Sequence, residues 1–189
     1  ETDALPARNR PMTDPERGAI EANWQDHCVS MRRRGGWPFA TSKFKADEAT
    51  AEERQARYEE MWVLGGMNLM INSYVGAIVD ADLNNEISDF VRNKIRQIVK
   101  DPITAKKLIP NYHIGTKRII LDNGYFETYN RDNVSLVDLN ADPIQSFSAD
   151  GVSTQSQDHA IDMLVLATGY DAVSGSMLHL NPRGRQGIP

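Results

Sequence analysis

The stretch IGTKRIILDNGYF, residues 114–126, marks the place where the pattern of the chain changes. Before Pro110 the apolar residues recur at the spacing of one helix face. Within the stretch, residues 118–121 form a short apolar run typical of a β-strand, and Gly115 and the adjacent cations Lys117 and Arg118 stand before or at its start. The sequence therefore predicts an α/β protein that is helical in its first half and strand-rich in its second.

Four helices are predicted upstream from capping residues and apolar spacing. Thr13 offers a capping side chain just ahead of Pro15, which indicates the start of a helix. The glycine pair at residues 35–36 indicates where this helix ends. Residues 50–53 have the spacing of a capping box. The four helices are expected over residues 14–34, 51–64, 68–79 and 83–98, and a short helical turn is expected through Leu108.

Five strands are predicted in the second half, over residues 118–121, 134–138, 144–148, 152–154 and 159–167. The third and fourth form a hairpin around Asp150 and Gly151. The last contains the run MLVLA at 163–167, which is of the kind buried on both faces of a parallel sheet. It ends at Thr168 and Gly169, and open α/β sheets bind ligands where their strands end.

Composition excludes some classes of protein. A net charge of −5 argues against a dedicated nucleic-acid binder, which needs clustered Lys and Arg. No apolar run approaches the roughly 20 residues that span a bilayer, so neither nucleic acid nor membrane is expected as a partner. The single cysteine, Cys28, excludes an intrachain disulfide and indicates a reducing compartment, here the cytoplasm. The chain begins at Glu1 rather than Met, and we expect an internal piece of a longer protein.

The pair Lys117 and Arg118 is the strongest candidate for chemistry on pattern alone, although such a pair is commonly just a feature of the surface. An arginine keeps its charge at any ordinary pH and can stabilise an anion, whereas a lysine suits a phosphate as a point charge. Thr168 and Gly169 alone are a weak signal, since such a pair is usually only a turn. The four histidines lack metal-ligand spacing, so no metal is expected, and no nucleotide-binding glycine motif occurs.

Longer motifs carry a resemblance to a known family. The stretch at 114–126, followed by YNRDNVSLVD at 129–138 and ATGYDAVSG at 167–175, closely resembles type I Baeyer–Villiger monooxygenases. The segment LPARN at 5–9 resembles the part of that family that leaves the first half of its NADP domain. The helical stretch, with YEEMW at 58–62 and FVRNKI at 90–95, resembles the family's helical insertion. The resemblance follows the family's order over essentially the whole chain.

The resemblance implies an organisation and a reaction. Residues 1–12 would be the tail of the first half of the NADP domain, 13–110 the helical insertion, 111–166 the second half of a Rossmann-like NADP-binding domain, and 167–189 the return to the FAD domain. The implied cofactors are FAD and NADPH. The implied reaction inserts one oxygen atom from O2 into a ketone through a flavin C4a-peroxide, and gives an ester or lactone.

The resemblance also implies roles for four residues. Arg118 matches the catalytic arginine that stabilises the anionic flavin peroxide, and it touches the cofactor. Lys117 matches the residue that contacts the 2′-phosphate of NADP. Thr168 and Gly169 match the segment between the NADP and FAD domains, close to both cofactors, and count as cofactor-binding. The role of Arg118 agrees with the general chemistry of arginine, because a permanent guanidinium charge can stabilise an anion in a site that excludes water.

Some of the family's motifs are missing here. The FAD-binding GxGxxG, the FxGxxxHxxxW fingerprint, the NADP glycine loop and the substrate-facing C-terminal region are absent. We therefore expect the chain alone to be inactive and to need the rest of the same polypeptide, the FAD domain, as its partner. Two alternatives stay open: a truncated or split chain that serves as a non-catalytic NADP-binding or helical interaction module, and a nitrogen- or sulfur-hydroxylating enzyme. The Lys117–Arg118 strand and the turn at residues 130–131 make the second alternative less favoured.

Overall fold

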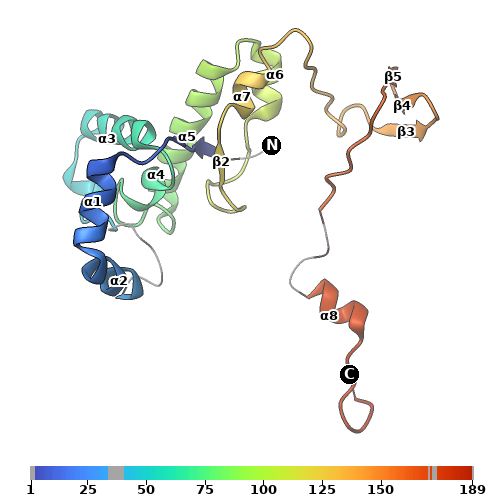
Figure 1. Ribbon diagram of the computed structural model, residues 1–189. Helices are drawn as coiled ribbons and strands as arrows, with labels where there is room; N and C mark the ends of the chain where they lie inside the picture. The colour runs from blue at the N-terminus through green and yellow to red at the C-terminus, as the bar shows by residue number, and fades with distance from the viewer. Residues whose placement is uncertain (1–2, 34–40, 170, 172–173, 189) are drawn as a thin grey trace. The chain divides into compact units, whose positions relative to one another are not determined.

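The computed structural model describes residues 3–33, 41–169, 171 and 174–188 (Figure 1). The chain divides into two compact units, Glu1–Leu136 and Val137–Pro189. The first unit is mostly helical around a short parallel strand pair, and the second is built on a small antiparallel sheet. Across the described residues, no helix has the length and apolar character needed to cross a membrane.

The core of the first unit lies between its two longest helices. These are α3, Ala51–Leu64, and α5, Ala81–Ile98. The rings of Tyr58 and Trp62 on α3 contact the ring of Phe90 on α5, and their centroids lie 5.6 and 5.9 Å from the Phe90 centroid, respectively. The capping box predicted at the start of α3 is confirmed, as are the apolar face and length of α5. The shorter helices of the unit are α1, Asp14–Ala22; α2, Trp24–Arg33; η1, Ala46–Glu48; α4, Asn68–Ile71; α6, Pro102–Leu108; and α7, Tyr125–Thr128.

Two helix predictions were wrong in extent. The helix expected over 14–34 is broken between α1 and α2 at Asn23, whose side-chain amide donates to the Ala19 carbonyl at 2.9 Å. Such a local bond competes with the helix ladder. The predicted stop at 34–36 lies outside the described residues. The helix expected over 68–79 is only α4, because a chain of turns follows it and Gly76 adopts φ +89°.

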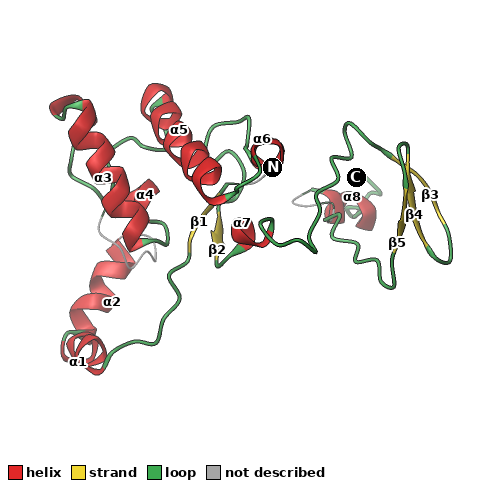
Figure 2. Cartoon of the chain, turned by 90° about the horizontal axis from the view of Figure 1, so that it is seen from above, coloured by secondary structure: helices red, strands yellow, loops and turns green. Residues whose placement is uncertain are grey.

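A parallel pair of strands joins distant parts of the first unit. Strand β1, Ala4–Pro6, pairs with β2, Ile120–Asp122, with Leu5 opposite Leu121. Both views show the two strands side by side (Figures 1 and 2). The strand predicted over 118–121 is confirmed in place but starts two residues later. The strand predicted over 134–138 was wrong: Val134 closes a turn onto the Arg131 carbonyl, and Leu136 packs against the core without a strand partner.

The second unit confirms the predicted hairpin. Strands β3, Ile144–Phe147, and β4, Gly151–Thr154, are antiparallel, and β5, Asp158–Ala160, pairs with the other edge of β4. The strand predicted over 159–167 was wrong beyond Ala160. The Ile161 N–H donates to the carbonyl of Asp150, which lies in the hairpin turn just before β4, so the chain beyond it has passed the end of β4. The run expected to be buried is exposed, with Val165 at 76%, and the helix α8, Gly175–Leu180, follows later.

Candidate functional site

The cations Lys117 and Arg118 lie on the connection between α6 and β2, at the amino end of β2. This connection has turns and bends rather than regular structure over residues 111–117. Both side chains are exposed. The connection is nevertheless anchored, because Ile114 in its middle is 2% exposed and belongs to the core of the unit. Two exposed cationic side chains are thus carried on an anchored piece of backbone.

The Lys117 ammonium lies over the face of an aromatic ring. Its Nζ is 4.5 Å from the centroid of the Tyr112 ring, a cation–π contact. Among the residues that the structure describes, neither Lys117 nor Arg118 forms an ion pair with a carboxylate. Two positive charges with no neutralising partner in contact are suited to bind an anionic ligand.

Asp3 is a residue near this pair that sequence reasoning missed. It stands directly before β1 and is 5% exposed, with the backbone N–H of Gly115 facing its carboxylate. Burial raises the pKa of Asp3, although the Gly115 N–H, Arg92 and Lys117 all act to lower it. Oxygen Oδ2 has no hydrogen-bond partner within the described part of the chain. No periodicity could have revealed this contact, since it depends on the pairing of β1 with β2.

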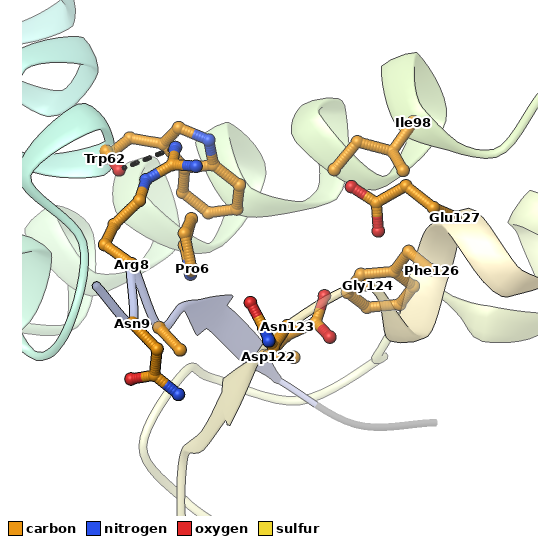
Figure 3. Close-up of a pocket in the computed structure, with 12 residues that line it drawn as sticks. Pro6, Arg8, Asn9, Trp62, Ile98, Asp122, Asn123, Gly124, Phe126 and Glu127 are labelled. Atoms are coloured by element: carbon orange, nitrogen blue, oxygen red, sulfur yellow. Dashed lines mark hydrogen bonds between the residues drawn. The ribbon is translucent and has the colours of Figure 1, made fainter. Parts of the chain in front are cut away.

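A pocket of about 360 Å³ lies at the opposite, carboxyl end of the two strands (Figure 3). The Arg8 guanidinium spans one side and donates to the carbonyls of Trp62 and Val63 at 3.5 and 3.2 Å. Carboxyl ends of parallel strands are common ligand sites, but Lys117 and Arg118 stand at the amino end. The pocket lining is Ala4, Pro6, Ala7, Arg8, Asn9, Trp62, Ile98, Asp122, Asn123, Gly124, Phe126 and Glu127.

Comparison with known proteins assigns the fold. The chain is 35% identical over 187 residues to a Baeyer–Villiger monooxygenase from Pseudooceanicola batsensis, which covers 97% of this chain. It superposes on the NADP+-bound crystal structure of cyclohexanone monooxygenase from Rhodococcus sp. Phi1 with a TM-score of 0.89 and 35% identity, over 99% of this chain. Along nearly its whole length, this chain therefore resembles a part of Baeyer–Villiger monooxygenases. The α/β fold expected from its motifs is thereby confirmed.

The similar proteins include one that is named for oxygenation of nitrogen, and each of them is longer than this chain. A phenazine N-monooxygenase from Lysobacter antibioticus is 39% identical over 186 residues, which cover 97% of this chain and 34% of that protein. The chain likewise spans 34% of the Pseudooceanicola protein and 36% of the cyclohexanone monooxygenase chain, about a third of each. No protein-family model matches the chain.

The other two predicted site residues, Thr168 and Gly169, lie in the second unit. Thr168 and Gly169 are exposed, and Gly169 adopts φ +82°, a backbone conformation that favours glycine. They belong to Val137–Pro189, whereas Lys117 and Arg118 belong to Glu1–Leu136. In the described segments, no group of three or more His, Cys, Asp or Glu side chains could hold a metal ion.

Proposed function

We propose that this chain provides the catalytic arginine and part of the NADPH-binding surface of a monooxygenase that uses FAD, NADPH and O2. The substrate class is a ketone and the product an ester or lactone. The observation that carries the proposal is the exposed cation pair Lys117–Arg118, held on a buried anchor, in a chain that matches the NADP+-bound cyclohexanone monooxygenase along 99% of its length.

The residues present fit a phosphorylated cofactor. A 2′-phosphate is a compact dianion, and the Lys117 ammonium is exposed beside a ring that limits its motion. Because no carboxylate is paired with it among the described residues, binding a phosphate breaks no ion pair. Lys117 would therefore hold the 2′-phosphate, and Arg118, the next residue along the chain, would supply its charge to the reaction.

Arg118 contributes a permanent positive charge. When bound, NADPH supplies the hydride that reduces FAD, and FAD activates O2. The guanidinium stabilises negative charge that develops at the reacting oxygen, and it cannot lose its own proton there. Thr168 and Gly169 contribute backbone near both cofactors. The segment boundaries after residues 12, 110 and 166 describe how these parts are divided among the NADP domain, the helical insertion and the return to the FAD domain.

The test is made on the intact protein, with its FAD domain. We expect a flavin absorbance spectrum in the purified protein, NADPH oxidation that accelerates when a cyclic ketone is added, and a lactone by mass spectrometry. Arg118→Ala should keep flavin reduction by NADPH but lose lactone formation by a factor of about 10² to 10³, the range found when one oxyanion donor is removed. Lactone formed near the wild-type rate by Arg118→Ala would refute the assigned role.

A second candidate reaction is oxygenation of a ring nitrogen. It is favoured by the 39% identity with the phenazine N-monooxygenase, which exceeds the 35% identity with the Pseudooceanicola Baeyer–Villiger monooxygenase. The two reactions are separated by offering the intact protein a cyclic ketone and an aromatic N-heterocycle in parallel. A lactone supports the first proposal, and an N-oxide without a lactone supports the second.

A non-catalytic NADP-binding or helical interaction module is not favoured, because the relatives matched along the chain are named as monooxygenases. The partner of this chain is then the rest of the same polypeptide, with its FAD domain. We propose a cytoplasmic location, in keeping with the single cysteine of this chain. Neither nucleic acid nor a membrane is proposed as a partner.

A further inference from the structure

Helix α5 carries a row of polar residues on a face that is otherwise apolar. Asn84, Ser88 and Arg92 follow one another at four-residue spacing, which places them along one side of the helix. Asn84 and Ser88 are each 3% exposed, and the Arg92 side chain is 20% exposed. Buried polar groups are costly unless they are hydrogen-bonded, so each needs a partner.

The partners are backbone groups of the connection that carries the cations. Arg92 donates from Nε to the Pro110 carbonyl and from Nη2 to the Tyr112 carbonyl, each at 3.0 Å. Ser88 Oγ accepts the Ile114 N–H at 3.0 Å and donates to Asn84 Oδ1 at 3.2 Å. Asn84 Nδ2 donates to the Ile114 carbonyl at 3.0 Å.

The polar row and the connection run in opposite directions. As α5 runs from 84 to 92, the contacted backbone runs from 114 back to 110. Asn84 and Ser88 both bond Ile114, and Arg92 bonds Pro110 and Tyr112, so the row holds the backbone of the connection at three residues. It takes the place of a neighbouring strand in satisfying the backbone of the connection.

Tyr112 links this row to the cations. Its carbonyl accepts from Arg92, and its ring faces the Lys117 ammonium. We propose that Arg92, supported by Ser88, is a positioning residue that sets where Lys117 stands and thereby the preference for a cofactor that carries a 2′-phosphate. The inference rests on the proposed function, since it takes Lys117 as the phosphate ligand.

The chain contains a matched control, Arg57 on α3. Its Nε and Nη2 donate to the carbonyls of Ser73 and Asn72, and its Nη1 pairs with Glu60 at 3.2 Å. Arg92 uses the same three nitrogens, with Nη1 on Asp89 at 2.8 Å. The Arg57 side chain is 22% exposed, close to the value for Arg92. Both arginines fix a backbone turn, but only Arg92 fixes the one that leads to Lys117.

The experiment compares Arg92→Met, Arg57→Met and Lys117→Ala in the intact protein. Binding of 2′,5′-ADP and of 5′-AMP is measured by calorimetry, together with the KM values for NADPH and NADH and the melting temperature. We expect both arginine variants to lower the melting temperature. Only Arg92→Met and Lys117→Ala should weaken 2′,5′-ADP relative to 5′-AMP, by about tenfold, because a charge-assisted hydrogen bond to phosphate is misplaced or lost.

Hydrogen exchange of the peptide over residues 111–118 gives a readout independent of activity, and it should quicken in Arg92→Met and stay unchanged in Arg57→Met. If Arg92→Met does not fold, Ser88→Ala, which removes only the acceptor of the Ile114 N–H, gives the same test with a smaller effect. Unchanged selectivity in the Arg92 or Ser88 variant, while Lys117→Ala loses it, overturns the positioning role alone. Unchanged selectivity in Lys117→Ala overturns the phosphate role as well.

Discussion

Gly65 is the residue at which a single added methyl group should disturb the first unit most sharply. It ends α3 with φ +71° and ψ −163°, a backbone region that is essentially restricted to glycine and costs other residues about 1–3 kcal/mol. A Cβ there would stand 2.6 Å from the Pro6 carbonyl oxygen and would also overlap Arg8 Cγ. The end of β1 would have to move, and the bond from the Gly66 N–H to the Pro6 carbonyl at 2.7 Å would weaken. With about 1 kcal/mol for that bond, we expect Gly65→Ala to lower the free energy of unfolding by about 2–4 kcal/mol.

The neighbouring glycine separates the steric effect from the conformational one. Gly66 also has a positive φ, +58°, but an added Cβ would meet no atom within 4 Å. Gly66→Ala should therefore cost only the left-handed backbone penalty, about 1–2 kcal/mol. Urea unfolding followed by the fluorescence of the buried Trp62 measures both variants. If Gly65→Ala is no less stable than Gly66→Ala, the close contact of α3 with β1 does not contribute to stability as argued.

Three further predictions concern local contacts. Thr50→Ala should lower the free energy of unfolding by about 1 kcal/mol because the Glu53 N–H loses its cap, and a thermal melt with no shift would contradict this. Asn130→Ala should cost about 1–2 kcal/mol in urea unfolding, since Asn130 bonds both the Ile98 carbonyl and the Lys100 N–H, and an unchanged midpoint would speak against it. The hydroxyls of Ser156 and Thr154 lower the pKa of Asp142, so its stabilisation is present above the ordinary Asp pKa and is lost as pH falls through the lowered value. The amide NMR signal of Ser156, which donates to Asp142 at 2.8 Å, should titrate with a midpoint below the ordinary pKa of Asp, and Asp142→Asn should abolish that titration.

Local signals explain which elements could be predicted. The cap of α3 consists of Thr50 and Glu53, three positions apart, and the structure contains both reciprocal bonds. The short helical turn expected through Leu108 is helix α6, which begins with Asp101 as cap and Pro102 behind it. The hairpin of β3 and β4 closes around its Asp150–Gly151 turn. In each case the decisive contact joins residues close in sequence.

Elements that depend on distant partners could not be predicted in the same way. Strand β1 has three residues, one of them Pro6, so it shows no alternation, and only its pairing with β2 makes it a strand. The opposite error occurred at residues 161–167, where an apolar run predicts a buried strand but β4 is too short to pair with it. In the sequence, the polar row on α5 looks like the solvent-facing side of an ordinary helix. Its partners, the backbone groups of residues 110–114, lie on the connection that follows α6.

The start of β2 shows why these corrections matter for the candidate site. The cations were recognised through their motif, and the sequence placed Arg118 within a strand. Successive side chains of a strand point to opposite faces of the sheet. A strand that included both cations would therefore direct them to opposite sides, so that one ligand could not easily reach both. In the structure β2 begins only at Ile120, and the turns before it leave both side chains exposed.

An irregular segment can present both cations to one ligand only if something other than a sheet fixes its backbone. The row from Asn84 to Arg92 does this from a helix that is itself packed against α3 through Phe90. A site built on a rigid element keeps its geometry better than one on a free loop. The backbone that carries the two cations is thus held by side chains of α5, and among them Arg92, which bonds the Tyr112 carbonyl, gives a sharper test of the site than any exposed neighbour.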